Sequence, residues 1–414
     1  MPARLIRVAQ VVRPAEGGIR RHVSSLLAAV TQDQFACTLF APASFKLDPS
    51  LESVPREDIA IGARTSPIPD LAAILKLSAR LRGRFDVVHA HGIRGALIGV
   101  AAARLAGIPA VFTAHNLLPA QGRAASSALR WLGRNAKVIA VSRAVAESLK
   151  KCGITVETKH IISNGVDLSQ FASPELSEAA RRELLRDLLG RCGATNLNKG
   201  WLHSSGDLSG PVFVVAGIGR LSREKGFDIL ISAFEIAASR GKVDQACQAG
   251  QTGLTRLTDA LPLPTPRWLL LIAGAGPEGA ALPHSIVRID GAALLGEIPD
   301  IVPLLRAADV VAIPSREEGQ GIVALEAMAA CKPVVASHVG GLIETVVDAE
   351  TGLLVPPEDT QALASALLKL SEEPELRHMM GRAGRARVEE RYTLSSMVDQ
   401  ISDVYRAMAN RADK

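Results

Sequence analysis

Two glutamates, Glu318 and Glu326, stand eight residues apart in a glycine-containing stretch that opens a helical pattern. A strand-like run over residues 309–314 precedes them, and the helical periodicity starts at Gly321, so Glu318 falls in the loop and Glu326 inside the helix. Unpaired amides at a helix N-terminus attract phosphate, and Gly319 lets a ligand approach the backbone, as does Gly321. Two carboxylates at different depths can accept hydrogen bonds from hydroxyls, so the stretch suits a sugar diphosphate. The alternative is a solvated loop glutamate beside a helix glutamate bonded to a neighbour.

A second candidate is the segment 219–226, GRLSREKG, which follows a strand-like run and precedes a helix. Arg220 and Lys225 lie at the end of that strand where ligands bind. An Arg fork and a Lys ammonium can clamp a diphosphate that gains charge as it leaves. The spacing is not that of a Walker A loop. A structural polar turn is the alternative.

Residues 274–279, GAGPEG, match GxGxxG after a strand-like run. Such a match alone is weak evidence for a dinucleotide site, and Asp290 follows it too closely to be the usual ribose acid. We interpret the segment, including Gly276, as a loop near a phosphate or a base. A nicotinamide-dependent oxidoreductase is the competing hypothesis.

Three histidines, His89, His91 and His115, stand at or near the ends of neighbouring predicted strands. No carboxylate or cysteine lies among them with ligand spacing, so we predict no metal site. His89 and His91 point to one face of their strand and fit a role as satisfied polar residues. His115 is the best candidate for a histidine on the catalytic face.

Strand-like and helical runs alternate through the first half of the chain, which predicts a parallel sheet covered by helices on both faces. Ligands bind such sheets beyond the carboxyl ends of the strands, where Gly17 and Gly18 also lie. The predicted strands cover residues 5–12, 35–41, 86–91, 110–115, 137–142 and 160–163. The predicted helices follow Gly17 and Gly18 to residue 30, then lie near residues 71–82, 94–106, 124–134 and 143–151.

The same alternation restarts after a polar segment, so we predict two doubly wound α/β domains. The predicted first domain covers residues 1–172 and regains residues 391–414, because the last helix can cross back to it. Residues 173–210 form a linker that opens with a helix over 176–189, and residues 211–390 form the second domain. Its predicted strands cover residues 212–218, 268–273, 310–314, 334–337 and 353–356, with a helix over 227–239 and no assignment for 241–266.

Charge is unevenly distributed along the 414 residues. Residues 1–170 hold 22 Lys and Arg against 11 Asp and Glu, and the remainder holds 25 against 31. The basic half, which includes Arg80, Arg82 and Arg84, could contact an anionic membrane surface. Solubilising surface charge is the alternative. Aromatic residues are only 3% of the chain, so we do not expect nucleic-acid binding.

The chain holds no apolar run of membrane-spanning length and starts without a secretory pattern. Its five cysteines are scattered and odd in number, which suits a reducing compartment. We therefore expect a cytoplasmic protein, with peripheral contact at the inner face of the cell membrane as a hypothesis.

Taken together, the motifs resemble those of the group 1 (GT4-type) retaining glycosyltransferases, which have the GT-B architecture. The segments that carry the resemblance are GG at 17–18, DVVHAH at 86–91, TAHN at 113–116, VSRAVAESL at 141–149, HIISNGVDLSQF at 160–171, GRLSREKG at 219–226, AGAGPEG at 273–279 and PSREEGQGIVALEAMAACKPVVASHVGGLIETV at 314–346.

The resemblance implies two Rossmann-like domains facing across a cleft, with the nucleotide sugar on the second domain and the acceptor on the first. Glu326 would bind the ribose hydroxyls and Glu318 the donor-sugar hydroxyls. Arg220 and Lys225 would stabilise the diphosphate of a UDP- or GDP-sugar. His115 would line the donor sugar, and Gly18 would lie near the reacting phosphate. No metal or other cofactor would be needed, and the acceptor would be a sugar, a lipid-linked molecule or a small molecule.

Two positions depart from the family pattern. Gln320 stands where phenylalanine is usual, and Cys331 stands where glycine is common, so a positive φ at Cys331 would cost about 1 kcal/mol or more. A non-catalytic nucleotide-sugar-binding protein of this fold and a sugar-nucleotide epimerase remain as alternatives to a transferase. The family usually serves cell-envelope polysaccharide or glycolipid synthesis, and we expect the same setting here.

Overall fold

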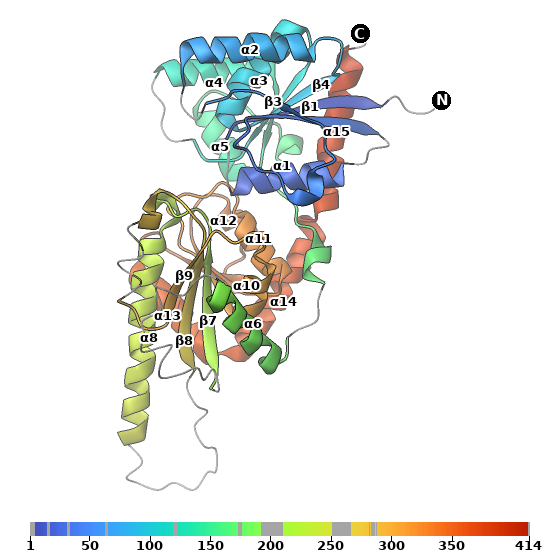
Figure 1. Cartoon of the computed structure of the whole chain (residues 1–414). Helices are drawn as coiled ribbons and strands as arrows, with labels where there is room; N and C mark the ends of the chain where they lie inside the picture. The colour runs from blue at the N-terminus through green and yellow to red at the C-terminus, as the bar shows by residue number, and fades with distance from the viewer. Residues whose placement is uncertain are drawn as a thin grey trace. The chain divides into compact units, whose positions relative to one another are not determined.

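The computed structural model of the chain (Figure 1) divides into two compact units. It describes residues 5–14, 17–30, 34–62, 65–118, 123–172, 176–191, 210–250, 266–280, 282, 286 and 288–412. The first unit holds residues 1–167, 319–322 and 390–414, and the second holds residues 168–318 and 323–389. The short segment 319–322 thus groups with the first unit, although its neighbours on both sides belong to the second.

The first unit contains a six-stranded parallel sheet in the order β3-β2-β1-β4-β5-β6. Its central strands are buried on both faces, as expected for a parallel sheet between two helical layers. The strand bounds are β1 Ile6–Val12, β2 Phe35–Ala41, β3 Arg56–Asp58, β4 Val87–His91, β5 Ala110–Ala114 and β6 Lys137–Ala140.

Helices of the first unit include the last helix of the chain, α15 (Leu394–Ala412), which packs against α1, β1 and β4. Its Ile401 and Tyr405 join a core with Val8 and Val87, so the expected return of the C-terminal helix to the first unit is confirmed. The other helices are α1 Gly18–Ala29, α2 Pro67–Leu81, α3 Gly92–Ala106, α4 Arg123–Asn135 and α5 Arg143–Lys151. Short 3₁₀ turns cover Pro49–Leu51 (η1) and Thr158–His160 (η2).

The second unit contains another six-stranded parallel sheet, in the order β12-β11-β10-β7-β8-β9. Because β7 lies between β10 and β8, the strand order reverses there, which is where α/β sheets bind ligands. The bounds are β7 Val212–Ile218, β8 Arg267–Ala273, β9 Ala292–Gly296, β10 Val310–Ile313, β11 Val334–Ser337 and β12 Gly352–Val355.

Helices cover both faces of this sheet, with α8 and α13 side by side on one of them (Figure 1). The helices are α6 Glu178–Arg191, α8 Phe227–Gly250, α10 Val302–Ala307, α11 Ile322–Ala329, α12 Leu342–Thr345, α13 Thr360–Glu372 and α14 Pro374–Arg391. Three 3₁₀ turns cover Leu168–Phe171 (η3), Arg223–Lys225 (η4) and Pro277–Ala280 (η5).

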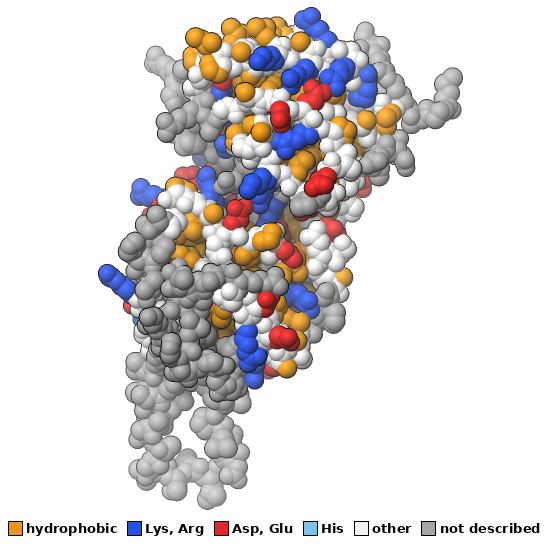
Figure 2. All heavy atoms as spheres, viewed as in Figure 1, with side chains coloured by type: hydrophobic (Ala, Val, Ile, Leu, Met, Phe, Trp, Pro, Cys, Tyr) orange, Lys and Arg blue, Asp and Glu red, His pale blue; other side chains and the backbone are white. Residues whose placement is uncertain are grey.

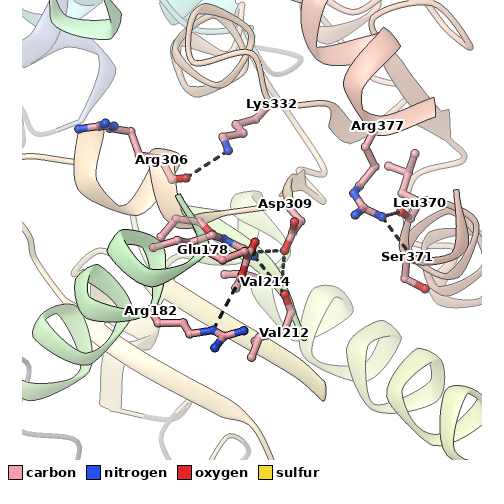
Figure 3. A network of polar contacts seen from close by, with 12 residues as sticks. Glu178, Arg182, Val212, Val214, Arg306, Asp309, Lys332, Leu370, Ser371 and Arg377 are labelled. Atoms are coloured by element: carbon pink, nitrogen blue, oxygen red, sulfur yellow. Dashed lines mark hydrogen bonds and ion pairs between the residues drawn. The ribbon is translucent and has the colours of Figure 1, made fainter. Parts of the chain in front are cut away.

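Helix α6 is held to the sheet by Asp309, which precedes β10 (Figure 3). One oxygen of this carboxylate accepts a hydrogen bond from Val214 N of β7 at 2.7 Å and also pairs with Arg181 of α6. Arg181 Nε donates to Ala307 O at 2.9 Å as well. A partly buried Arg–Asp pair with further hydrogen bonds fixes the helix orientation more firmly than apolar contact alone.

The predicted two-sheet α/β architecture is confirmed, with corrections at the sheet edges. Residues 160–163 do not form a strand, since only Ile161 makes an isolated bridge, to Ala140. The short edge strand β3 and the strand β9 were not predicted. Helix α8 continues to Gly250, through part of the unassigned segment 241–266. The linker residues 192–209 and the segment 251–265 lie outside the described residues.

No helix within the described ranges is long and apolar enough to cross a bilayer. Cys331, which stands where glycine is common, has a positive φ of 56°. It lies in the turn between α11 and β11, where the backbone N–H of Cys331 donates to Met328 O. The turn geometry therefore imposes a left-handed conformation on a residue that carries a Cβ.

Candidate functional site

In the second unit, the ends of β7 and β10 bring together Lys225 and Glu318. Lys225 Nζ lies 2.6 Å from Glu318 Oε2, and Ser315 Oγ donates to the same oxygen at 3.2 Å. The two charged side chains are 26% and 14% exposed, so the pair is only partly solvated. The two segments predicted from sequence therefore meet at the switch point of the sheet, and each charge holds the other in place.

The loop that carries Lys225 is fixed by close backbone approach. Gly226 has φ 65°, and a Cβ built on it would lie 2.1 Å from Pro314 O, at the end of β10. Arg316 reinforces the contact, because its N–H donates to Glu224 O at 2.8 Å and its Nη1 donates to Arg223 O at 2.8 Å. These contacts hold the Lys225 and Glu318 segments in one arrangement.

Arg316 is a residue that sequence reasoning missed. Its guanidinium binds Asp228 through two bonds of 2.9 and 2.8 Å and binds Glu358 at 2.8 Å. The hydrogen bond that Arg316 donates to Asp228, followed by the one it donates to Glu358, raises the pKa of Arg316. Arg316 lies in the charged run SREEG, residues 315–319. Sequence alone does not show which charged residue of such a run forms ion pairs that hold the loop.

The motif suggested that Arg220 binds a diphosphate, and in the structure its guanidinium pairs with Glu224. The two side chains are 50% and 35% exposed. Glu224 is not among the predicted site residues. The guanidinium of Arg220 is thus half-exposed and can turn toward a ligand without breaking a buried contact.

Glu326 lies in the second turn of α11 and is half-buried. Helix α11 begins at Ile322, directly after Gly321, as the periodicity predicted. Gly321 itself has φ 87°, so the turn into the helix needs a residue without a Cβ.

The GxGxxG segment packs against the Arg220 loop. A Cβ on Gly276 would lie 2.4 Å from Leu221 O, and one on Gly274 would lie 1.8 Å from Gly219 O. Leu221 N donates to Ala275 O at 2.9 Å and Glu278 N donates to Leu221 O at 2.9 Å. A four-residue 3₁₀ turn, η5, begins at Pro277 within this segment. These glycines therefore have a packing explanation, which counts against the nicotinamide hypothesis.

In the first unit, Gly17 caps α1 with φ 63° and ψ −130°, a conformation that suits glycine. Gly18 starts the helix, and a Cβ on it would make only an ordinary contact, at 3.5 Å, with Ile322. The N-terminus of α1 has no side-chain cap, so its amides suit an anion.

The segment 319–322 is bound to the first unit through Gly319 and Gln320. A Cβ on Gly319 would lie 2.1 Å from His115 O, and Gly319 O accepts a bond of 2.6 Å from Ser142 Oγ. Gln320 Oε1 accepts bonds from Asn164 N at 2.8 Å and from Asn164 Nδ2 at 2.6 Å. The glutamine found in place of the usual phenylalanine therefore has a polar partner in the same chain.

A buried histidine cluster adjoins these contacts. His22 Nδ1 lies 2.7 Å from Asn164 Oδ1. Because Asn164 Nδ2 donates to Gln320, its Oδ1 accepts the His22 Nδ1 proton, and His22 Nε2 carries a lone pair. That buried nitrogen has no hydrogen-bond partner among the described atoms. Burial lowers the pKa of His22 to about 4, so the ring is neutral at pH 7.

A hydrogen-bonded chain connects this cluster with α15. Gln10 Nε2 donates to Tyr405 Oη at 2.9 Å, which leaves Gln10 Oε1 to accept from His91 Nε2 at 2.8 Å. His91 Nδ1 then carries a lone pair, 3.4 Å from His115 Nε2. The chain places a proton on His115 Nε2 and leaves Nδ1 as its acceptor.

His89 belongs to the same chain, and its ring centroid lies 4.1 Å from that of His91. Its Nδ1 lies 2.6 Å from Tyr405 Oη and its Nε2 lies 2.7 Å from Thr113 Oγ1, so both nitrogens are satisfied, as the sequence favoured. Burial is the first cause that lowers the pKa values of His89, His91 and His115 well below the ordinary value.

One group with the spacing of a metal site occurs in the part of the chain that the structure describes. One ring nitrogen each of His22, His91 and His115 lies within 4.8 Å of the others. The three histidines considered from sequence were His89, His91 and His115, and the structure has His22 in the group in place of His89. Sequence reasoning missed His22, Gln10 and Tyr405, because a lone polar residue in an apolar strand or helix gives no sign of its partner.

Two parallel sheets of this topology, each covered by helices, fit the two-domain Rossmann-like GT-B fold. The chain belongs to the group 1 glycosyltransferases. The model of the glycosyl transferases group 1 matches residues 205–387, and that of glycosyltransferase family 4 matches residues 16–170.

Relatives and solved structures agree with this assignment. A D-inositol 3-phosphate glycosyltransferase of Saccharomonospora viridis is 31% identical over 352 residues, which cover 79% of this chain and 71% of the relative. An alpha-maltose-1-phosphate synthase of Mycolicibacterium smegmatis is 29% identical over 98% of this chain and 100% of the relative. The Anabaena protein Alr3699/HepE, solved in complex with UDP-glucose, has a TM-score of 0.71 at 23% identity and covers 98% of this chain. All of its own chain is covered.

Proposed function

We propose that the protein transfers a sugar from a UDP- or GDP-sugar to a hydroxyl acceptor with retention of configuration, in cell-envelope polysaccharide or glycolipid synthesis. The observation that carries the proposal is the Lys225–Glu318 pair at the switch point of the second sheet, where the ion pair holds both side chains in place. A cation there can take up the charge of a departing diphosphate, and the neighbouring carboxylate can accept donor hydroxyls.

We assign each residue a role in binding the donor according to its chemistry. Glu326 binds the ribose hydroxyls, Glu318 binds donor-sugar hydroxyls, and Lys225 with Arg220 neutralises the diphosphate. Loop amides at Gly319, Gly321 and the α1 N-terminus lie where glycine allows close approach. His115 is neutral, with Nδ1 as an acceptor for a sugar hydroxyl.

The reaction needs no protein nucleophile. The acceptor oxygen bonds to the anomeric carbon on the face from which the phosphate oxygen departs, and the acceptor proton passes to that oxygen. The products are the new glycoside, of unchanged anomeric configuration, and a nucleoside diphosphate. We propose that the reaction proceeds without a metal, because Lys225 and Arg220 supply the positive charge.

The names of the relatives add phosphorylated molecules to the acceptors that the family resemblance implies. D-inositol 3-phosphate and maltose 1-phosphate both carry a phosphate on a polyol or sugar. An acceptor panel should therefore include inositol phosphate and hexose 1-phosphates beside membrane extract.

The test is nucleotide release from a panel of UDP- and GDP-sugars, with and without the acceptor panel. We expect release from one donor, stimulated by one acceptor, unchanged by a chelator, and lost in Lys225→Ala and Glu326→Ala. The matched controls Lys369→Ala and Glu372→Ala change exposed residues of α13 and should retain activity. Sugar conversion without any acceptor would instead indicate an epimerase, and binding without release would indicate a non-catalytic binding protein.

A further inference from the structure

Helix α2 of the first unit is apolar on two faces. Its inner face buries Ala73, Leu77 and Leu81, which are 4%, 0% and 0% exposed. Ile68, Leu71 and Leu75 fall at spacings of three and four residues, so they share a different face, and they are 83%, 58% and 55% exposed. One face already supplies the packing, so the fold of the unit does not require the second.

A further exposed apolar side chain, Leu105, lies near the end of α3. Leu105 there is 50% exposed, and Arg82 Nη2 donates to Leu105 O at 3.1 Å, which brings the two helix ends together. Among the described residues, seven large apolar side chains are exposed; three of them form this face of α2, and Leu105 of α3 is a fourth. Single exposed apolar residues are ordinary, but a contiguous group marks an interaction surface.

Basic side chains border the face. Lys76 and Arg82 have no carboxylate at ion-pair distance among the described residues. Arg80 and Arg84 share one carboxylate, that of Glu57, at 3.8 and 2.6 Å. Figure 2 shows hydrophobic and basic side chains gathered over α2 at the top of the view. The border thus has an excess of positive charge.

We infer that this face of α2 docks the protein on an anionic lipid bilayer, with Ile68, Leu71 and Leu75 entering the interface and Lys76, Arg82 and their neighbours meeting the headgroups. Aliphatic residues bordered by Lys and Arg are the composition of an interfacial helix. The stretch 67–84 holds no Tyr, Trp or Met, which protein interfaces favour. The inference goes beyond the proposed function and does not depend on the donor.

The test is co-sedimentation of the full chain with vesicles of phosphatidylcholine, with and without phosphatidylglycerol, and with no nucleotide sugar present. We expect binding to the anionic vesicles alone, weakened by salt. The triple change Ile68→Ser, Leu71→Ser and Leu75→Ser should lower the partition coefficient roughly tenfold or more, since each side chain loses its burial in the interface. The double change Lys76→Glu and Arg82→Glu should lower it by at least about fivefold for each charge.

Controls come from exposed apolar residues of the second unit, Ile343 and Met379, which are 44% and 54% exposed. Changing both to serine should leave vesicle binding unchanged. Absence of binding to anionic vesicles at low salt, or equal binding by the triple variant, would overturn the inference. The inference would also be overturned if the native protein self-associated in sedimentation, the triple variant were monomeric, and neither protein bound lipid. Because the assay needs no turnover, its failure is distinct from failure of the transferase proposal.

Discussion

At the residue scale, the Lys225–Glu318 pair is the contact on which the chemistry depends. Lys225→Ala removes the cation beside the leaving group, and we expect kcat to fall on the order of a hundredfold or more. Glu318→Gln keeps the side-chain shape but removes the charge, and should lower kcat less than Lys225→Ala. Steady-state nucleotide release measures both. Equal rates in native protein and Lys225→Ala would exclude a role for the lysine in the reaction.

Cys331 gives a second prediction at this scale. Its φ of 56° costs an L-residue about 1–2 kcal/mol, and glycine would remove that cost. Glycine also makes the unfolded chain more flexible, which destabilises the fold by about 0.4–1 kcal/mol. Cys331→Gly should therefore raise the free energy of unfolding by about 0.5–1 kcal/mol, as measured by denaturant titration. Ala349→Gly, at φ 60°, is a matched position and should act in the same direction. Destabilisation by both changes would show that neither turn is strained.

At the element scale, α15 contributes more than apolar packing to the first unit. Tyr405 Oη contacts both Gln10 and His89, and all three side chains are fully buried. Tyr405→Phe leaves two buried polar groups without this partner and should cost about 1–3 kcal/mol of unfolding free energy. In a double-mutant cycle with Gln10→Met, we expect a coupling energy of at least about 0.5 kcal/mol. Additive costs in the cycle would contradict the hydrogen bond.

Sequence periodicity predicted most central strands and helices because buried parallel strands read as apolar runs. It failed where that signal is weak. The three-residue edge strand β3, Arg56–Asp58, carries only charged residues, and residues 160–163 look like a strand but make a single bridge. Motifs predicted that Glu318 and Lys225 lie in one site, and the two side chains do meet, since strand ends of a parallel sheet lie at one edge. They could not predict the Arg220–Glu224 pair or the Gln320–Asn164 bonds, which depend on side-chain geometry.

At the scale of the whole molecule, the buried histidines make stability depend on pH. The pKa of His22 is lowered to about 4 and those of His89, His91 and His115 are lowered well below the ordinary value. In the unfolded chain these histidines have a pKa of about 6.5. Below that pH the unfolded chain binds more protons than the folded chain does, so the free energy of unfolding falls as pH falls. Each histidine contributes at most about 1.4 kcal/mol per pH unit, between about pH 6.5 and its own folded pKa.

Denaturant titrations at pH 7.5 and pH 5 measure this effect. We expect lower stability at pH 5, and a smaller difference in His89→Gln, which removes one titrating ring. His338, outside the cluster, provides the matched control His338→Gln, which should keep the native difference. Equal stability of the native protein at both pH values would show that the histidines are not held neutral.

The central claim is that the second unit binds a nucleotide diphosphate at Lys225, Glu318 and Glu326. Titration calorimetry with UDP and GDP, on native protein and Glu326→Ala, tests it most directly. We predict saturable binding of one nucleotide by the native protein and at least roughly tenfold weaker binding by the variant, because a buried ribose hydroxyl loses a charged acceptor. Absence of binding of either nucleotide to native protein, or equal binding by Glu326→Ala, would contradict the claim.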